Sequence, residues 1–254
     1  PTDNDLGNDM PERCAIWKNA HNELLMQSID TSSIGNIKNV KVDYFHELSN
    51  CRLQLSYNIY GNGMVKLKQT LYPSGSELPE LPRFGMKTTI PSSFNSLEWF
   101  GRGPHESYWD RKSSARIDRF KGKVWDQTFK YVRPQETGNK TDVRWMAMHN
   151  GNVGIMAKGI PFFDGSVHHY NYTNLYHAKG SQLHGAIDIK KENQIDWLID
   201  FKQMGVGGDN SWGAKPHKKY TLPMDTSTYS LEYVLIPFSQ KNQLEELARI
   251  NLDD

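Results

Sequence analysis

Three segments of the chain gather residue types that can perform acid–base chemistry or bind a ligand. The first, Trp99–Lys112 (WFGRGPHESYWDRK), places His105, Glu106 and Asp110 beside glycine and proline. A constrained loop that carries histidine and carboxylates can act as general acid and base. The alternative is a rigid corner between strands, whose carboxylates pair with the arginines of the same segment. The spacing favours this second interpretation.

The second segment, Arg133–Trp145, carries two carboxylates, Glu136 and Asp142, which we expect on a glycine-bearing loop. Opposite charges alternate throughout this segment. A solvated or mutually paired network of charges is therefore favoured over a catalytic pair.

The third segment, Met204–Gly213 (MGVGGDNSWG), is rich in glycine. Its glycines do not fit the GxGxxG pattern, and no strand–helix context follows, so it does not indicate a phosphate-binding loop. Trp212 has small, polar neighbours that cannot bury an indole, whereas Trp197 lies between apolar residues of an alternating strand. We therefore expect Trp212 on an exposed surface loop, where an aromatic face can pack against a sugar.

Four histidines, His168, His169, His177 and His184, lie close together in the sequence. Their spacing matches no standard zinc pattern, so we predict no metal site here. The chain has 2 cysteines, which excludes a disulfide scaffold and leaves the cellular compartment undecided.

Short alternating segments indicate the elements that must position these residues. Apolar residues occupy every second position in 52–59 and again in 64–72, on either side of a Gly-Asn-Gly turn, which predicts an antiparallel hairpin followed by a loop to Pro82. Further strands are expected at 154–157, 185–189, 195–201 and 228–235, and a short helix at 242–250. Many short strands separated by glycine and proline predict an all-β fold, a large antiparallel β-sandwich with little helix.

Composition excludes two classes of partner. The 254 residues contain 30 Lys plus Arg and 29 Asp plus Glu, a net charge of +1, which argues against a nucleic-acid binder. No apolar run approaches the ~20 residues of a membrane span, and no signal-peptide pattern opens the chain, so we expect no membrane partner. Aromatic residues make up 11% of the chain, which suits both β-sheets and sugar binding.

Taken together, four segments resemble one known family. Pro1–Asp5 (PTDND), Trp99–Lys112, Arg133–Trp145 and Met204–Gly213 resemble, in order, the C-terminal small-chain domain of the large bacterial β-galactosidases of glycoside hydrolase family 2. The resemblance covers almost the whole chain, and only the tail, 239–254, is not matched.

The resemblance implies a fold for this chain and places catalysis in another domain. Such enzymes have five domains, with two catalytic glutamates on a central TIM barrel and a last domain that is a galactose mutarotase-like supersandwich. Residues 1–254 would then be a single β-sandwich domain, an N-terminally truncated part of a much larger enzyme with further β-structure upstream. No residue of this chain matches a catalytic position, including Glu98, Glu106 and Glu136. Trp212 matches an aromatic residue that packs against the sugar in the aglycone subsite, and Gly7 matches the start of a mobile loop nearby.

The resemblance also implies partners and cofactors. The galactoside would bind together with the absent barrel, the parent enzyme would be a homo-oligomer, and magnesium and sodium would bind in other domains, so no cofactor is expected in this chain. The resemblance leaves the compartment unknown, with the cytoplasm and the periplasm of a bacterium both open. Two alternatives remain open: a free-standing mutarotase-like epimerase, which needs a glutamate base and histidine acid in one cleft, and a non-catalytic carbohydrate-binding module that uses Trp212.

Overall fold

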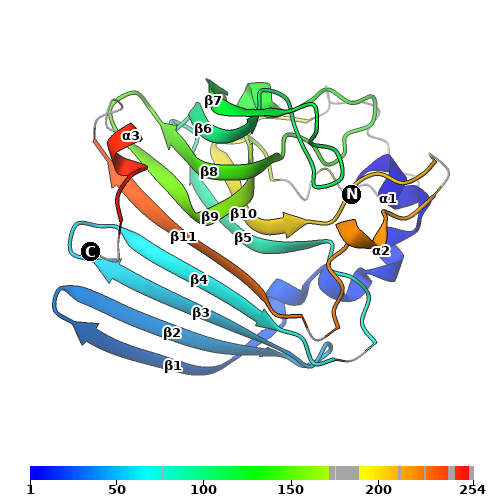
Figure 1. The fold of residues 1–254 in the computed structure, drawn as a ribbon, viewed down its shortest axis with the longest axis horizontal. Helices are drawn as coiled ribbons and strands as arrows, with labels where there is room; N and C mark the ends of the chain where they lie inside the picture. The colour runs from blue at the N-terminus through cyan, green and yellow to red at the C-terminus, as the bar shows by residue number, and fades with distance from the viewer. Residues whose placement is uncertain are drawn as a thin grey trace.

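Antiparallel β-strands dominate the computed structural model of the chain (Figure 1). It describes residues 1–75, 77–171, 175, 189–210, 213–225, 227–239 and 244–251. The strands are β1 (Leu24–Ile34), β2 (Ile37–His46), β3 (Cys51–Tyr60), β4 (Val65–Tyr72), β5 (Arg83–Pro91), β6 (Ser96–Gly103), β7 (Arg116–Lys123), β8 (Lys140–His149), β9 (Gly154–His168), β10 (Gln194–Gln203) and β11 (Tyr229–Phe238). The predicted all-β, antiparallel fold is confirmed.

The expected hairpin is formed by β3 and β4. Their register pairs Leu53 with Leu71 and Ile59 with Val65, so the alternating apolar residues of both strands share one face. The turn between them closes with a hydrogen bond from the Tyr60 amide to the Met64 carbonyl (2.9 Å), and Gly63 adopts a φ of +85°. Glycine suits this turn because a left-handed backbone is strained for other residues.

The strands form two layers that share β9. The first layer is the main path, β1-β2-β3-β4-β11-β9-β8-β6-β7. The second layer consists of β10 and β5, and it branches from the main path because β10 pairs with β9. The first part of β9 pairs with β11 through residues 154–159, and its last part pairs with β10 through residues 164–168. One long strand thus leaves the first layer and joins the second, which packs β10 and β5 over the middle of the sheet (Figure 1).

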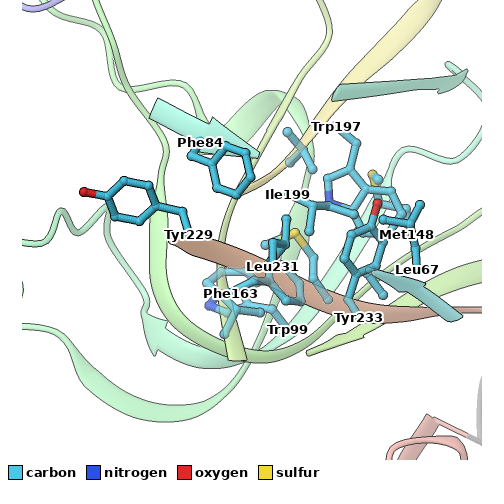
Figure 2. Close-up of a cluster of buried hydrophobic side chains, with 14 of the residues drawn as sticks. Leu67, Phe84, Trp99, Met148, Phe163, Trp197, Ile199, Tyr229, Leu231 and Tyr233 are labelled. Atoms are coloured by element: carbon cyan, nitrogen blue, oxygen red, sulfur yellow. The ribbon is translucent and has the colours of Figure 1, made fainter. Parts of the chain in front are cut away.

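The main core lies between these two layers. Figure 2 shows large side chains from both layers meeting, among them Trp99 of β6, Trp197 of β10 and Tyr233 of β11. Trp197 is fully buried, as its alternating neighbours predict. Burial of several aromatic and aliphatic side chains at this one place is the main source of stability in such a fold.

Helices are short and peripheral. The structure describes α1 (Asp3–Gly7), α2 (Met10–Arg13) and α3 (Leu244–Leu247), with 3-10 turns at Ala15–Trp17, Ala20–Asn22, Trp125–Gln127 and Lys218–Tyr220. Of the helix expected at 242–250, residues 242 and 243 lie outside the described residues, and α3 covers Leu244–Leu247, with Leu244 fully buried. Of the strand expected at 185–189, all but the last residue lie outside the described residues.

Two sequence assignments need correction. Trp99–Gly103, expected as part of a loop, is the second half of β6, where Trp99 points into the core. Asp142, expected on a loop, lies inside β8, at a left-handed position (φ +53°) beside a break in the β8–β9 register. In both places glycine and charged residues suggested a loop. A sheet tolerates such residues where a β-bulge interrupts the pairing of two strands or where another part of the chain comes close to the backbone.

None of the helices in the described ranges is long and apolar enough to cross a membrane.

Candidate functional site

The N-terminal segment forms a capped helix against the second segment. The hydroxyl of Thr2 accepts a hydrogen bond from the Asp5 amide (3.2 Å), and Asp5 Oδ2 accepts one from the Thr2 amide (2.7 Å). This reciprocal capping box begins α1. Asp3 is held by Gln135, whose Nε2 donates to Asp3 Oδ2 (2.9 Å), and the Pro1 carbonyl accepts from the Glu136 amide (3.1 Å).

The other side of α1 contacts the glycine-rich segment. Asn4 Nδ2 donates to the carbonyl of Ala214 (3.1 Å). Gly7 meets Gly213 backbone to backbone, so closely that a Cβ added to Gly213 would clash with the Gly7 carbonyl oxygen, and Gly213 has a φ of +103°. The structure therefore places Gly7 beside the loop that contains Trp212. Trp212 itself lies outside the described residues.

Asp110 supports the same loop from the first segment. Its two carboxylate oxygens accept hydrogen bonds from the Val206 amide (3.1 Å) and the Gly207 amide (2.7 Å). Further along, His217 Nε2 lies 2.7 Å from Asp209 Oδ1. Asp110 thus does not pair with an arginine, as one interpretation of the sequence expected, but holds the backbone of the loop.

Glu106 is a structural anchor. Its Oε1 accepts from Arg111 Nη2 (2.7 Å) and from the hydroxyl of Tyr131, and its Oε2 accepts from the Thr137 hydroxyl (2.9 Å) and the Gly138 amide (2.8 Å). A carboxylate with this many donors is fully engaged. The ion pair with Arg111 confirms the expected pairing of charges within the first segment.

The neighbouring His105 is exposed, and its Nε2 lies 3.1 Å from the hydroxyl of Ser114. The contacts of His105 and Glu106 go to different partners, so the two residues do not form an acid–base pair in this arrangement.

Asp142 joins the first and second segments. Its Oδ2 lies 2.6 Å from Arg102 Nε and 2.9 Å from Lys112 Nζ. Burial acts to raise the pKa of Asp142, but hydrogen bonds from Arg102 and Lys112 outweigh it and hold that pKa below the usual value. The prediction of a mutually paired network of charges is confirmed for this carboxylate.

A group of buried charges behind these segments escaped the sequence analysis. Asp164 of β9 lies opposite Asp200 of β10 in the sheet register, and both are almost fully buried. Burial raises the pKa of each to about 7. Arg83 Nε lies 2.9 Å from Asp200 Oδ2, and Lys140, 2% exposed, has a pKa lowered to about 8 by burial. The available signal was weak: a charged residue at each end of an apolar run, as in DWLID at 196–200.

The two histidines that the structure describes in the 168–184 region are engaged separately. His168 is buried, and burial, followed by the nearby charges of Arg83 and Lys140, lowers its pKa to about 3. His169 Nε2 lies 2.9 Å from Asn95 Oδ1. His177 and His184 lie outside the described residues. Within the described ranges, no three His, Cys, Asp or Glu side chains group as metal ligands would.

Comparison with known proteins identifies the family. The sequence matches the family described as beta galactosidase small chain over residues 1–235. The chain belongs to this family. A beta-galactosidase of Priestia megaterium is 37% identical over 241 residues, which cover 91% of this chain and 22% of that protein, and one of Halalkalibacterium halodurans is 30% identical over 239 residues, which cover 92% and 23%. This small chain thus spans about a fifth of the length of the curated relatives that it matches.

Solved structures that align with most of the chain have little sequence in common with it. A galactose 1-epimerase of Lactobacillus acidophilus aligns with a TM-score of 0.41 and 7% identity, covering 84% of this chain and 66% of that one. An alpha-galactosidase of Geobacillus stearothermophilus aligns with a TM-score of 0.45 and 10% identity, covering 85% and 28%.

Proposed function

We propose that this small chain is the C-terminal accessory domain of a retaining β-galactosidase that hydrolyses terminal β-D-galactosides such as lactose. The proposal rests on membership of the family and on relatives, named beta-galactosidase, that are about four times as long as the chain. In this proposal the catalytic carboxylates belong to another domain of the parent protein.

The hydrogen bonds and ion pairs of three candidate carboxylates, Glu106, Asp142 and Glu98, support the placement of catalysis in another domain. A retaining glycosidase needs two carboxyl groups about 5–5.5 Å apart, one to attack the sugar and one to exchange protons. Glu106 and Asp142 are each held by several donors, and Glu98 is 2.9 Å from Arg119 Nη2. Carboxylates bound in this way have a structural role: removing a partner would leave a buried charge uncompensated and would destabilise the folded chain.

The observation that carries the proposed role is the contact between Gly7 and Gly213. It brings α1 against the loop of residues 204–213. The carboxylate of Asp110 accepts hydrogen bonds from the Val206 and Gly207 amides of this loop. We infer that this supported loop presents Trp212 toward the sugar in the aglycone position. An indole face holds a sugar without fixing its hydroxyl groups, which suits both a leaving glucose and an incoming acceptor.

The epimerase alternative has less support. It needs a glutamate and a histidine acting together in one cleft. Glu106 is saturated with donors, His105 bonds elsewhere, and the pKa of His168, lowered to about 3, leaves that imidazole uncharged near neutral pH. The binding-module alternative shares Trp212 with our proposal and differs from it only in lacking a catalytic parent.

Two experiments test the proposal. The isolated chain should release no chromophore from an aryl β-galactoside, whereas release that scales with protein concentration and is lost in Glu136→Gln would overturn the accessory role. In the full-length protein, Trp212→Ala should raise KM for lactose and weaken glucose as an acceptor, with a smaller effect on cleavage of an aryl galactoside.

Phe162→Ala is the matched control in the full-length protein, because Phe162 is an exposed aromatic residue on β9. It should change neither KM nor the acceptor preference. Equal kinetics for Trp212→Ala and Phe162→Ala would refute the assigned role of Trp212.

A further inference from the structure

A cavity of about 410 Å³ opens between the N-terminal segment and the first residues of β5. Asp5 of α1, Trp17, Arg83 of β5, Glu136 and Met204 are among its lining residues. The volume lies within the range of about 300–1,000 Å³ that is typical of small-molecule sites. The residues come from four separate parts of the chain, so only the folded protein assembles this site.

Two buried acceptors in the cavity lining have no hydrogen-bond donor among the described residues. They are Asp5 Oδ1 and Glu136 Oε1, on side chains of residues that are 3% and 7% exposed. Asp5 uses its other oxygen to cap α1, and the nearest cation to Glu136 Oε1, Arg83 Nη2, is 3.6 Å away, beyond hydrogen-bond distance. A buried acceptor without a donor is costly, so a ligand that brings two donors would be stabilised here.

The charged side chains of the lining balance. Asp5 and Glu136 contribute two negative charges, and Arg83 and Lys18 contribute two positive ones. An ionic ligand would therefore gain little from the lining as a whole. A neutral molecule whose hydroxyl groups donate hydrogen bonds matches the two acceptors better.

The remainder of the lining is mainly apolar. Met10, Cys14 and Met204 form a small buried cluster against which Trp17 packs. The indole nitrogen of Trp17 donates to the Pro79 carbonyl (3.1 Å), which fixes the orientation of the ring. A ligand that carries hydroxyl groups and also presents C–H faces fits this combination of surfaces, since such faces pack on aromatic and thioether groups.

We propose that this cavity binds a neutral monosaccharide or small glycoside, whose hydroxyl groups donate to Asp5 and Glu136 and whose C–H face packs against Trp17. Asp5 lies on α1, the helix that ends at the contact with Gly213. A bound sugar therefore also fixes the position of that helix beside the loop of residues 204–213.

The test uses D-galactose and lactose as probes of the 254-residue chain, with saturation-transfer NMR to detect binding and calorimetry to measure it. Saturable binding is expected for at least one sugar, weakened about tenfold in Glu136→Gln, because the charged acceptor becomes a neutral amide oxygen that forms a weaker hydrogen bond. Trp17→Leu should also weaken it. Glu245→Gln, a change in an exposed glutamate of α3, is the matched control and should bind as the unchanged chain does. Circular dichroism of each variant establishes that it is folded.

Three results would overturn the proposal. The first is no saturable binding of either sugar. The second is binding that persists unchanged in Glu136→Gln or, where that variant does not fold, in Trp17→Leu; this would place the sugar elsewhere, for example at Trp212. The third is stronger binding of n-butylammonium than of galactose, which would make the cavity a cation site.

Discussion

Strands β8 and β1 show opposite burial although both belong to the same continuous sheet path. Nine of the ten residues of β8 are buried, whereas ten of the eleven residues of β1 are exposed. β8 pairs with a strand on each side, β6 and β9, whereas β1 pairs with β2 alone and forms one margin of the sheet path (Figure 1). The second layer covers the middle of the sheet and does not reach β1, so position in the sheet decides which strands contribute to the core.

The apolar pattern by itself does not distinguish the two regions. In β1 and β2, Met26 pairs with Tyr44 and Ile29 pairs with Val42, in line with the core-facing residues of β3. Yet Met26 and Ile29 are 59% and 56% exposed, and Val42 is 6% exposed. The row of apolar side chains thus runs from the core to an open margin, and its stabilising effect should fall along the row.

The largest loss of stability is expected where the second layer covers the sheet. Trp197→Ala removes a fully buried side chain from between the layers and should lower the free energy of unfolding by about 3–5 kcal/mol. Chemical denaturation measures this change. Trp125→Ala, at a partly exposed tryptophan, is the control and should cost much less. A loss below about 1 kcal/mol for Trp197→Ala would mean that the two layers do not pack as described.

The buried carboxylates of the second layer predict a pH dependence. Folding raises the pKa of Asp164 from 3.8 to about 7, so between these values the folded state binds more protons than the unfolded state. The associated stability is complete below about pH 4 and is lost as the pH rises through 7. Asp164→Asn should therefore gain on the order of a few kcal/mol, relative to the unchanged chain, between pH 4 and 8.

Denaturation midpoints of the two proteins across this pH range test the prediction. Asp118→Asn, a change in an exposed carboxylate of β7, is the control. Parallel pH profiles for Asp164→Asn and the unchanged chain would show that Asp164 is not titrating in this window.

A smaller effect is expected at the contact between α1 and the glycine-rich loop. Gly213→Ala places a Cβ against the Gly7 carbonyl at a φ of +103°, and such strain costs on the order of 1–3 kcal/mol. Amide hydrogen exchange in residues 1–8 should accelerate, because the helix loses its neighbour. Gly61→Ala has open space around the added Cβ and should leave this exchange unchanged; equal exchange in both variants would argue against the contact.

The smallest effect should occur at the open margin. Ile29→Ala should change the free energy of unfolding by no more than about 0.5 kcal/mol, as for most surface substitutions. Val42→Ala, at its cross-strand partner, should cost about 1–3 kcal/mol, because that side chain is buried. Equal losses for the two variants would mean that Ile29 is covered in solution.

The sequence analysis located several strands with regular alternation and also the start of β9 at 154–157. It missed β2, although Val40, Val42 and Tyr44 alternate there with polar residues. β3, β4, β10 and β11 follow every-second-residue patterns, and each lies where expected. β1, with serine, threonine and aspartate among its residues, and β6, with glycine at two of its last three positions, gave no such pattern. Their conformation depends on pairing with neighbouring strands, because β-propensity is set largely by context.

The sequence likewise predicted one part of the candidate site and missed another. The sequence pointed to Gly7 and to the loop of residues 204–213, and the structure brings the two together. It gave no indication that Asp110 supports this loop or that Arg83 and Glu136 border one cavity, because those contacts join residues about 50 to 100 positions apart. The position of Trp212 is a prediction that the described residues do not test.

The sequence by itself determined what depends on local order: the antiparallel class, the hairpin of β3 and β4 and the family to which the chain belongs. The tertiary structure alone decided which apolar rows are covered, which carboxylates are engaged and where the cavity lies. Those properties depend on contacts between residues far apart in the chain, such as Asp110 with Val206 and Arg83 with Glu136, which only folding brings together.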